Sequence, residues 1–350
     1  MSDNPPPWPQ NTWYVACTPD EIDGGKPLAR RICGQRIVLF RGVDGQAAAL
    51  EDFCPHRGAP LSLGTVSEGR LVCGYHGLTV DGAGAPVCMP GQRVEALPHV
   101  RAFPVVERYG FVWIWPGDPR RADAEALPVL HWAERSDWAY GGGMFHIACD
   151  YRLMIDNLMD LTHETYVHST SIGQKEIDEA PVTTRREGET VITSRFMDGV
   201  RPPPFWASNL RSAGLPDDGP VDRWQVCNFS LPSHVMIEVG VALAGRGGYD
   251  ADPADKVASV VVDFMTPETE TSHWYFWGMA RSFAVEDEAV TRSIRDGQHR
   301  IFSEDLCVLE QQQANLSAYP DRRLLRLNID AGGVHSRKVI EAAISRETAA

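Results

Sequence analysis

The chain has 350 residues, which is long for a single hydrophobic core, so two domains are the first expectation. Its 47 acidic residues outweigh 33 basic ones and give a formal net charge of −14, with no basic run to offset it. This balance argues against a nucleic-acid partner. The start MSDNPPPWPQ lacks a signal-peptide pattern, and no run of about 18 apolar residues occurs, so we expect a cytoplasmic protein without a membrane partner.

The first third of the chain alternates short apolar runs with Gly and Pro, as small barrels and sandwiches do. A polar, proline-flanked stretch at 116–128 predicts the domain boundary, with one domain over 1–130 and another over 131–350. Eight cysteines in such a chain favour reduced thiols, some of them ligands, over a disulfide framework. The strands predicted in the first domain are 36–40, 47–52, 77–80, 103–107 and 111–115.

The second domain is predicted to combine long strands with helices. Its helices are expected over 151–168 and over 286–316, before Pro320. A hairpin turn is expected at TPETE, 266–270. The predicted strands are 145–149, 190–196, 224–231, 234–243, 257–265 and 273–280.

Two Gly-rich segments, CPHRGAPLSLG (54–64) and CGYHGLTV (73–80), carry Cys54, His56, Cys73 and His76. Two thiolates and two imidazoles suit either a tetrahedral zinc ion or a Rieske [2Fe–2S] cluster, in which the cysteines bind one iron and the histidines the other. The alternating order of Cys and His lets each loop give one ligand to each iron, whereas zinc sites usually take like pairs from one loop. The spacing favours the cluster over zinc or over four ordinary core residues.

These residues resemble the Rieske domain of Rieske-type non-haem iron oxygenases. Respiratory Rieske proteins carry an additional cysteine pair that cross-links the two loops, but Ala59 and Tyr75 stand at the corresponding positions here. The resemblance therefore implies the oxygenase and ferredoxin branch, whose cluster is fed with electrons from NADH.

A second pair of histidines, His163 and His168 in HETYVH, lies five residues apart, one more than in the HExxH helix of zinc proteases. In an ideal helix this spacing separates two side chains by about 140°, so they meet only at a π-bulge or an unwound turn. A protease would also need Glu164 as its base, and we expect that side chain to point elsewhere. A facial triad of two histidines and one carboxylate on Fe(II) fits better.

The third ligand is expected from the later helix, within RIFSEDLCVLEQQ (300–312). Asp305 falls in the middle of the apolar stripe that the helical period assigns to Ile301, Val308 and Leu309. A carboxylate in a buried face is costly unless a cation pairs with it, which favours Asp305 as an iron ligand. A buried arginine or an amide as its partner is the alternative.

The segment NLMDLTHETYVH (157–168) is similar to the catalytic-iron motif of the same family, so the resemblance covers essentially the whole chain. It implies an α+β fold: an N-terminal all-β Rieske [2Fe–2S] domain and a C-terminal catalytic domain of the helix-grip (START-like) type with an antiparallel sheet. It also implies His163, His168 and Asp305 as ligands of a mononuclear Fe(II).

The resemblance gives Asp160 a separate, catalytic role. It would accept a hydrogen bond from the His163 ring and another from the partner subunit's His76, so that electrons cross a subunit interface. This implies a head-to-tail ring, usually a homotrimer. Asn157 would lie beside the iron or merely face polar core.

Within this family the chain looks most like the aromatic O-demethylases of the vanillate and dicamba type. That implies a monooxygenase that uses O2 to hydroxylate the methyl group of a methoxy-substituted aromatic acid, after which the product collapses to a phenol and formaldehyde. Electrons would come from NAD(P)H through a separate flavin and iron–sulfur reductase. Candidate substrate contacts are Asn228, His234, Asp263 and Arg201.

Three other functions are open at this point. A ring-hydroxylating dioxygenase would form a cis-diol and release no formaldehyde. A Rieske electron carrier fused to a ligand-binding domain would lack the second iron, which the motif residues at 160–168 and Asp305 argue against. A zinc-stabilised binding module would contain no iron.

Overall fold

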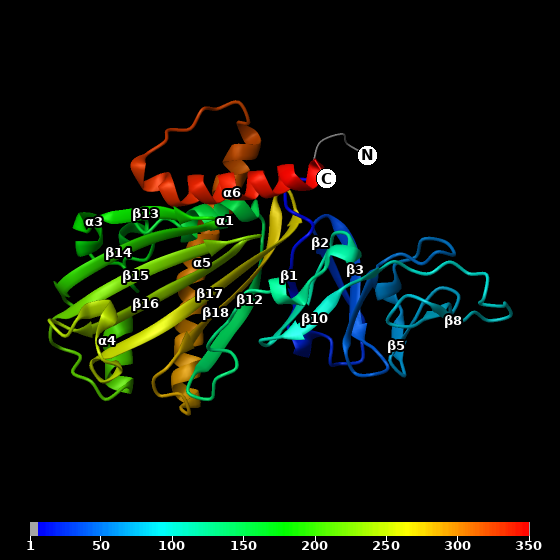
Figure 1. Cartoon of the computed structure of the whole chain (residues 1–350), viewed down its shortest axis with the longest axis horizontal. Coiled ribbons are helices and arrows are strands. Elements are labelled where there is room, and N and C mark those ends of the chain that lie inside the picture. The colour runs from blue at the N-terminus through cyan, green and yellow to red at the C-terminus, as the bar shows by residue number, and fades with distance from the viewer. Residues whose placement is uncertain (1–5, 350) are drawn as a thin grey trace. The chain divides into compact units, whose positions relative to one another are not determined.

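In the computed structural model, which describes residues 6–349, the chain forms two compact units (Figure 1). The first runs to Leu130 and also takes Thr266–Thr269 and the end of the chain from Arg346. The second covers the remainder of the chain from His131 to Ser345. Among the described residues, no helix is long and apolar enough to cross a membrane.

A seven-stranded sheet in the order β12-β18-β17-β16-β15-β14-β13 forms the second unit. Its central strands pair antiparallel over their full length, as β15 and β16 do from Val221↔Leu243 to Ser230↔His234. The strands are β12 (Ala139–Ile147), β13 (Val182–Glu187), β14 (Thr190–Val200), β15 (Val221–Ser230), β16 (His234–Leu243), β17 (Lys256–Thr269) and β18 (Ser272–Arg281).

Helix α5 (Glu288–Ala318) packs against β12 and β18. The side chain of Asp287 caps its start by accepting hydrogen bonds from the backbone N–H groups of Ala289 and Val290. Its buried stripe, Ile294, Gln298, Ile301, Phe302, Asp305 and Leu309, follows the helical period. The other helices are α1 (Tyr151–Leu158), α2 (Glu164–Val167), α3 (Glu176–Glu179), α4 (Pro204–Ser212) and α6 (Ala331–Thr348).

The structure differs from the sequence-based elements at three places. The helix expected over 151–168 is broken, because α1 ends at Leu158 and α2 is a single turn. The hairpin expected through 266–270 is present, but its turn lies at 270–271, since β17 continues to Thr269. Helix α6 has no predicted counterpart: its first turn contains Gly332 and Gly333, weak helix formers, which let it approach α1 closely. A Cβ on Gly333 would lie 2.5 Å from the Asp156 carboxylate.

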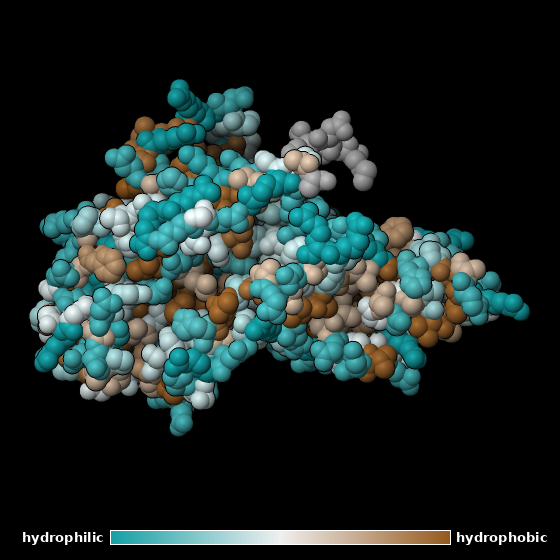
Figure 2. Space-filling view, viewed as in Figure 1, coloured by the Kyte–Doolittle hydropathy of each residue, from teal (hydrophilic) through white to brown (hydrophobic). Residues whose placement is uncertain are grey.

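The segment between α5 and α6, residues 319–330, carries large apolar side chains in contact with solvent. Leu324, Leu325, Leu327 and Ile329 are between 41 % and 81 % exposed. Figure 2 shows apolar side chains gathered on this segment, at the upper left. Contiguous exposed apolar groups of this kind are typical of an interaction surface.

Three small sheets build the first unit, in the orders β1-β11-β10, β2-β3-β4-β9 and β5-β6-β7-β8. The predicted all-β character of this part of the chain is thereby confirmed. Its strands are β1 (Tyr14–Cys17), β2 (Leu28–Ile32), β3 (Gln35–Arg41), β4 (Ala47–Glu51), β5 (Thr65–Ser67), β6 (Arg70–Val72), β7 (Thr79–Val80), β8 (Pro86–Cys88), β9 (Ala102–Phe103), β10 (Val105–Arg108) and β11 (Phe111–Ile114).

The two Gly-rich loops make the same backbone turn. Gly58 and Gly77, each four residues after a cysteine, take φ angles of 70° and 74°, which side chains with a Cβ disfavour. The matching bonds, 2.8–3.1 Å long, are Cys54 N–H to Ala59 O and Gly58 N–H to Cys54 O in the first loop, and Cys73 N–H to Leu78 O and Gly77 N–H to Cys73 O in the second.

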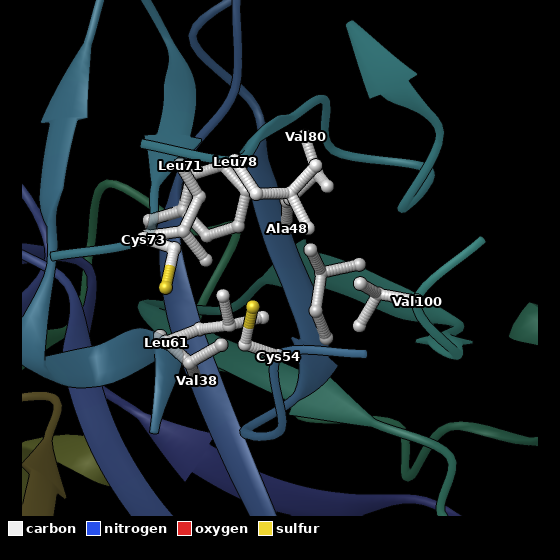
Figure 3. Packing of buried hydrophobic residues seen from close by; sticks show 11 residues of the cluster. Val38, Ala48, Cys54, Leu61, Leu71, Cys73, Leu78, Val80 and Val100 are labelled. Atoms are coloured by element: carbon white, nitrogen blue, oxygen red, sulfur yellow. The ribbon is translucent and has the colours of Figure 1, made fainter. Parts of the chain in front are cut away.

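An apolar cluster of buried side chains packs against both loops (Figure 3). Cys54 and Cys73 belong to it, and Figure 3 shows their side chains among those of the cluster. The buried carboxylate of Asp52 adds a polar tie by accepting 2.7 Å hydrogen bonds from the N–H and hydroxyl groups of Ser62. The other members of the cluster are Val38, Phe40, Ala48, Leu50, Leu61, Leu71, Leu78, Val80 and Val100.

Gly64 marks the closest approach of the first loop to β6, because a Cβ there would lie 2.0 Å from the carbonyl oxygen of Val72. We expect Gly64→Ala to shift this backbone and to destabilise the first unit by at least about 2 kcal/mol. Thermal unfolding followed by circular dichroism measures the loss. Gly24→Ala is the control, since a Cβ at Gly24 meets nothing within 4 Å. Equal stability of the two variants would contradict the packing described for the loop.

Candidate metal sites and the adjoining cavity

The four side chains from the Gly-rich loops gather at the end of the first unit. The thiols of Cys54 and Cys73 are buried, whereas the rings of His56 and His76 are exposed, with centroids 4.5 Å apart. Burial raises the pKa of the Cys54 thiol and the neighbouring Cys73 thiol raises it further, although the backbone N–H groups of His56 and Arg57 oppose this. A bound metal would instead stabilise the thiolates.

The donor types and their order suit a Rieske cluster. Each loop carries one cysteine followed by one histidine, so it can give one ligand to each iron, with both cysteines on one iron and both histidines on the other. A tetrahedral zinc would take all four side chains at a single ion.

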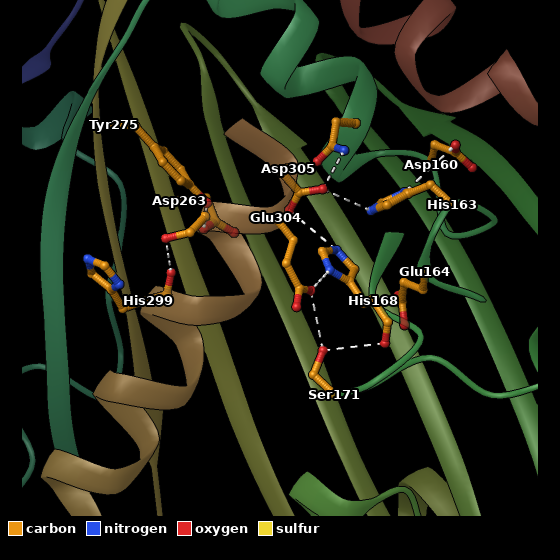
Figure 4. A network of polar contacts seen from close by, with 12 residues as sticks. Asp160, His163, Glu164, His168, Ser171, Asp263, Tyr275, His299, Glu304 and Asp305 are labelled. Carbon is orange, nitrogen blue, oxygen red and sulfur yellow. Dashed lines mark hydrogen bonds and ion pairs between the residues drawn. The ribbon is translucent and has the colours of Figure 1, made fainter. Parts of the chain in front are cut away.

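The second site combines His163, His168 and Asp305 (Figure 4). The Nε2 atom of His163 lies 3.6 Å from Oδ1 of Asp305, and Nε2 of His168 lies 3.3 Å from Oδ2. One carboxylate thus faces two imidazole nitrogens, all of them largely buried. This donor set fits a divalent iron, which takes two histidines and a carboxylate on one face.

A break in the helix brings the two histidines together. His163 precedes the single turn α2, and His168 ends it with φ −107° and ψ 32°, outside the helical region. The ring centroids lie 5.3 Å apart as a result. Of the two distortions considered, the unwound turn is the one observed.

Two carboxylates flank His168. Glu304, adjacent to Asp305 on α5, accepts a 2.7 Å hydrogen bond from Nδ1 of His168, which directs Nε2 toward Asp305. Burial disfavours the charged ring, but Asp305 and Glu304 outweigh burial and raise the pKa of His168 to about 8. Glu304 was missing from the sequence-based site, although its place beside Asp305 in SED was the available signal.

Asn157 and Asp160 lie where α1 leads into the site. The amide of Asn157 donates a 3.0 Å hydrogen bond to Oδ1 of Asp305, so this residue supports the carboxylate. Asp160 is 3.8 Å from Nδ1 of His163, too far for the hydrogen bond that the family resemblance implies. Its Oδ1 accepts instead from the N–H and hydroxyl groups of Thr162.

A cavity adjoins the second site, and Glu164 lines it. Glu164 is buried, lies 3.2 Å from Nη2 of Arg223, and accepts a hydrogen bond from the amide of Gln225. Gln298 of α5 adds another buried amide to the wall, and most of the remaining wall is apolar. The apolar part consists of Leu158, Leu161, Ile172, Phe205, Trp206, Ile237, Val239, Val261, Met279, Ile301 and Phe302.

The candidate substrate contacts Asn228, His234, Asp263 and Arg201 do not line this cavity. Asn228 donates to the carbonyl of Val226 and to Glu238, and Arg201 is exposed. The ring of His234 is buried against Phe264, with centroids 4.8 Å apart. Asp263 is fully buried and accepts a 2.6 Å hydrogen bond from the hydroxyl of Tyr275.

Two family models match the chain: the Rieske [2Fe–2S] domain over residues 12–104 and the vanillate O-demethylase oxygenase C-terminal domain over residues 147–346. The vanillate O-demethylase oxygenase subunit of Pseudomonas sp. (strain HR199 / DSM 7063) is 64 % identical over 340 residues, or 97 % of this chain and 96 % of the relative. The subunit of the same description from Pseudomonas sp. (strain ATCC 19151) is 67 % identical over 320 residues, or 91 % and 97 % of the two chains.

The oxygenase component of dicamba O-demethylase from Stenotrophomonas maltophilia is 37 % identical over 355 residues, covering 97 % of this chain and 99 % of the relative. Among solved structures, dicamba monooxygenase bound to 3,6 dichlorosalicylic acid matches with a TM-score of 0.90 at 34 % identity, covering 97 % of this chain and 99 % of the other. The expected family resemblance and fold class are confirmed.

Asp263 gives the second unit a pH-dependent stability. Burial raises the pKa of this carboxyl to about 8 from an ordinary value of 3.8, against the opposing hydrogen bond from Tyr275. Between those values the folded state keeps a proton that the unfolded state has lost, so stability falls as the pH rises. We expect Asp263→Asn, neutral at every pH, to gain about 3 °C or more in melting temperature over the parent protein between about pH 5 and pH 8.

Thermal unfolding of the iron-free protein across this pH range measures the difference. Asp296→Asn, at an exposed carboxylate on α5, should follow the parent protein. A constant gap between Asp263→Asn and the parent at all pH values would show that Asp263 does not hold the extra proton.

Proposed function

Because this chain belongs to the vanillate O-demethylase oxygenase family of Rieske non-haem iron oxygenases, we propose that it removes the methyl group of a methoxy-substituted aromatic acid such as vanillate. It is the oxygenase component of a monooxygenase system. The observation that carries the proposal is the cavity with an apolar wall that opens onto His163, His168 and Asp305.

We assign Cys54, His56, Cys73 and His76 as ligands of a [2Fe–2S] cluster. His163, His168 and Asp305 would hold a mononuclear Fe(II), with Glu304 orienting the His168 ring and Asn157 supporting the carboxylate. When bound, the two centres supply electron transfer and O2 activation, with electrons from NAD(P)H through a separate flavin and iron–sulfur reductase.

The chain's own contribution is to bury and orient the aromatic ring. The apolar wall from β16, β17 and α5, including Ile237, Val261 and Phe302, excludes water from the ring and from its methyl group. In the overall reaction ArOCH3, O2, NAD(P)H and H+ give ArOH, formaldehyde, water and NAD(P)+. The hydroxylated methyl group is a hemiacetal, which loses formaldehyde as the phenol oxygen takes up a proton.

Turnover with a flavin reductase and NADH over a panel of methoxybenzoates tests this function. Formaldehyde and a phenol should appear in equal amounts, with one O2 consumed for each. A cis-diol without formaldehyde would show a dihydroxylating enzyme instead. Absence of O2 uptake with both metals loaded would favour an electron carrier with a ligand-binding domain.

A ring assembly is part of the proposed function. A groove beside α5 contains Asp160 and continues over half-exposed Val308, which the sequence pattern had placed in the buried stripe, to exposed Leu324 and Leu325. The loops of the first unit carry exposed Tyr75 and Leu63 near the two cluster histidines. We propose that the loops of one subunit dock on this groove of the next in a closed homotrimer.

In that assembly Asp160 would link the partner subunit's His76 to His163, which requires the 3.8 Å separation between Asp160 and Nδ1 of His163 to close to hydrogen-bond distance. We expect Asp160→Asn to keep both metals and the oligomeric state, yet to slow electron transfer from the cluster to the mononuclear iron at least about tenfold, since the amide cannot accept from two imidazoles at once. Single-turnover stopped-flow of the reduced protein measures the rate. Asp178→Asn is the control at an exposed carboxylate. A normal rate in Asp160→Asn would refute the bridging role.

The two ligand sets should be separable by substitution. We expect His163→Ala to abolish turnover and to lower the iron content by the mononuclear ion, while the visible absorption of the cluster stays. Cys73→Ala should remove that absorption, since the cluster loses one of its two thiolates. Iron and sulfide analysis with absorption spectra measures both. Loss of the cluster in His163→Ala, or zinc in place of iron, would contradict the assignment.

A further inference from the structure

Several buried polar atoms at the wall of the cavity have no partner among the described residues, including Oε1 of Gln225, Nε of Arg223 and Oε1 of Gln298. The side chain of Gln225, on β15, is only 4 % exposed, and its carbonyl oxygen Oε1 makes no hydrogen bond with any described residue. A buried amide carbonyl that is left unsatisfied costs free energy, so such atoms are normally paired with protein, water or ligand. A ligand in the cavity is the natural partner of Gln225 Oε1.

Glu164 decides which end of the Gln225 amide meets the cavity. The NH2 group of Gln225 donates to Oε1 of Glu164, and Glu164 is also ion-paired with Arg223 at 3.2 Å. A carboxylate beside a guanidinium accepts hydrogen bonds and donates none, so the amide cannot turn over without losing this bond. Gln225 therefore presents its carbonyl oxygen, a hydrogen-bond acceptor, to a ligand in the cavity.

The ligand group at this position must be a donor. A carboxylate or an ether oxygen has no proton to give, whereas a phenolic hydroxyl donates one hydrogen bond and can also accept. Nε of Arg223, two residues earlier on the same face of β15, is buried and also lacks a partner among the described residues. A hydroxyl is the one ring substituent of vanillate that suits both an acceptor and a donor.

Gln225 lines the same cavity as His163, and Glu164, which holds the Gln225 amide, directly follows His163 in the chain. We propose that Gln225, positioned by Glu164, selects methoxyarenes whose ring carries a free hydroxyl beside the methoxy group, by accepting a hydrogen bond from that hydroxyl. This inference rests on the proposed demethylase function and names the substrate class of the same site.

Binding under anaerobic conditions tests the inference without turnover. Isothermal titration calorimetry compares 4-hydroxy-3-methoxybenzoate with 3-methoxybenzoate and 3,4-dimethoxybenzoate, at a pH where the phenol is protonated. We expect the parent protein to bind the hydroxylated acid about tenfold more tightly than the other two, as a buried donor–acceptor pair requires. Equal affinities would overturn the proposal.

Two variants test whether Gln225 and Glu164 cause this preference for the hydroxylated acid. Gln225→Leu should bind all three acids within about twofold of one another, because the acceptor is gone. Glu164→Gln keeps the shape but lets the Gln225 amide turn over, so we expect the preference to fall several-fold with metal content unchanged. Asn228→Ala, at an amide on the same strand that does not line the cavity, should keep the full preference.

The outcomes separate this inference from the proposed function. A preference that survives in Gln225→Leu, or one that is lost in Gln298→Leu instead, would overturn the role of Gln225. Formaldehyde released equally well from acids with and without the hydroxyl would leave the demethylase function standing and remove the selection. If Glu164→Gln does not fold, Gln225→Leu and the comparison of the three acids in the parent protein still decide the matter.

Discussion

A carboxylate buried on an otherwise apolar helix face is the constraint on which the second unit depends. Asp305 lies in the stripe of α5 between Ile301 and Leu309, where an unpaired charge would be too costly to keep. The imidazoles of His163 and His168 face it. Burial lowers the pKa of each ring, but the neighbouring carboxylates raise it by more, so both pKa values are raised. The same three side chains would hold a divalent metal, and because it would bind the deprotonated imidazoles, metal binding would be coupled to folding.

Both candidate metal sites are irregular segments held by regular ones. The Gly-rich loops of the first unit turn twice in the same way over an apolar cluster, and the break between α1 and α2 lies beside α5 at the cavity. Such segments can present side chains that no helix or strand could bring together, provided that their ends are fixed. The close packing that fixes these segments leaves no room for a methyl group at Gly64.

Carboxylate and amide side chains position the groups that meet a metal or a ligand at the cavity. Glu304 orients His168, Asn157 supports Asp305, and Glu164 fixes Gln225. None of these links contributes much stability alone, but each removes one rotational freedom from a group that meets metal or ligand. Dicamba monooxygenase has the same fold, so the side chains at the cavity wall, and not the fold, must account for differences in substrate.

The sequence by itself determined the chemistry and the class of fold, because both rest on local signals. Loop spacing specified Cys54, His56, Cys73 and His76 as a set, and helical periodicity singled out Asp305. Only the tertiary structure decided which polar residues meet at the cavity. Gln225 and Glu164 are 61 positions apart and become neighbours through sheet pairing and a helix break, whereas Asn228, His234 and Asp263 lie elsewhere. The period of a strand tells which side chains share a face, but not what packs against that face.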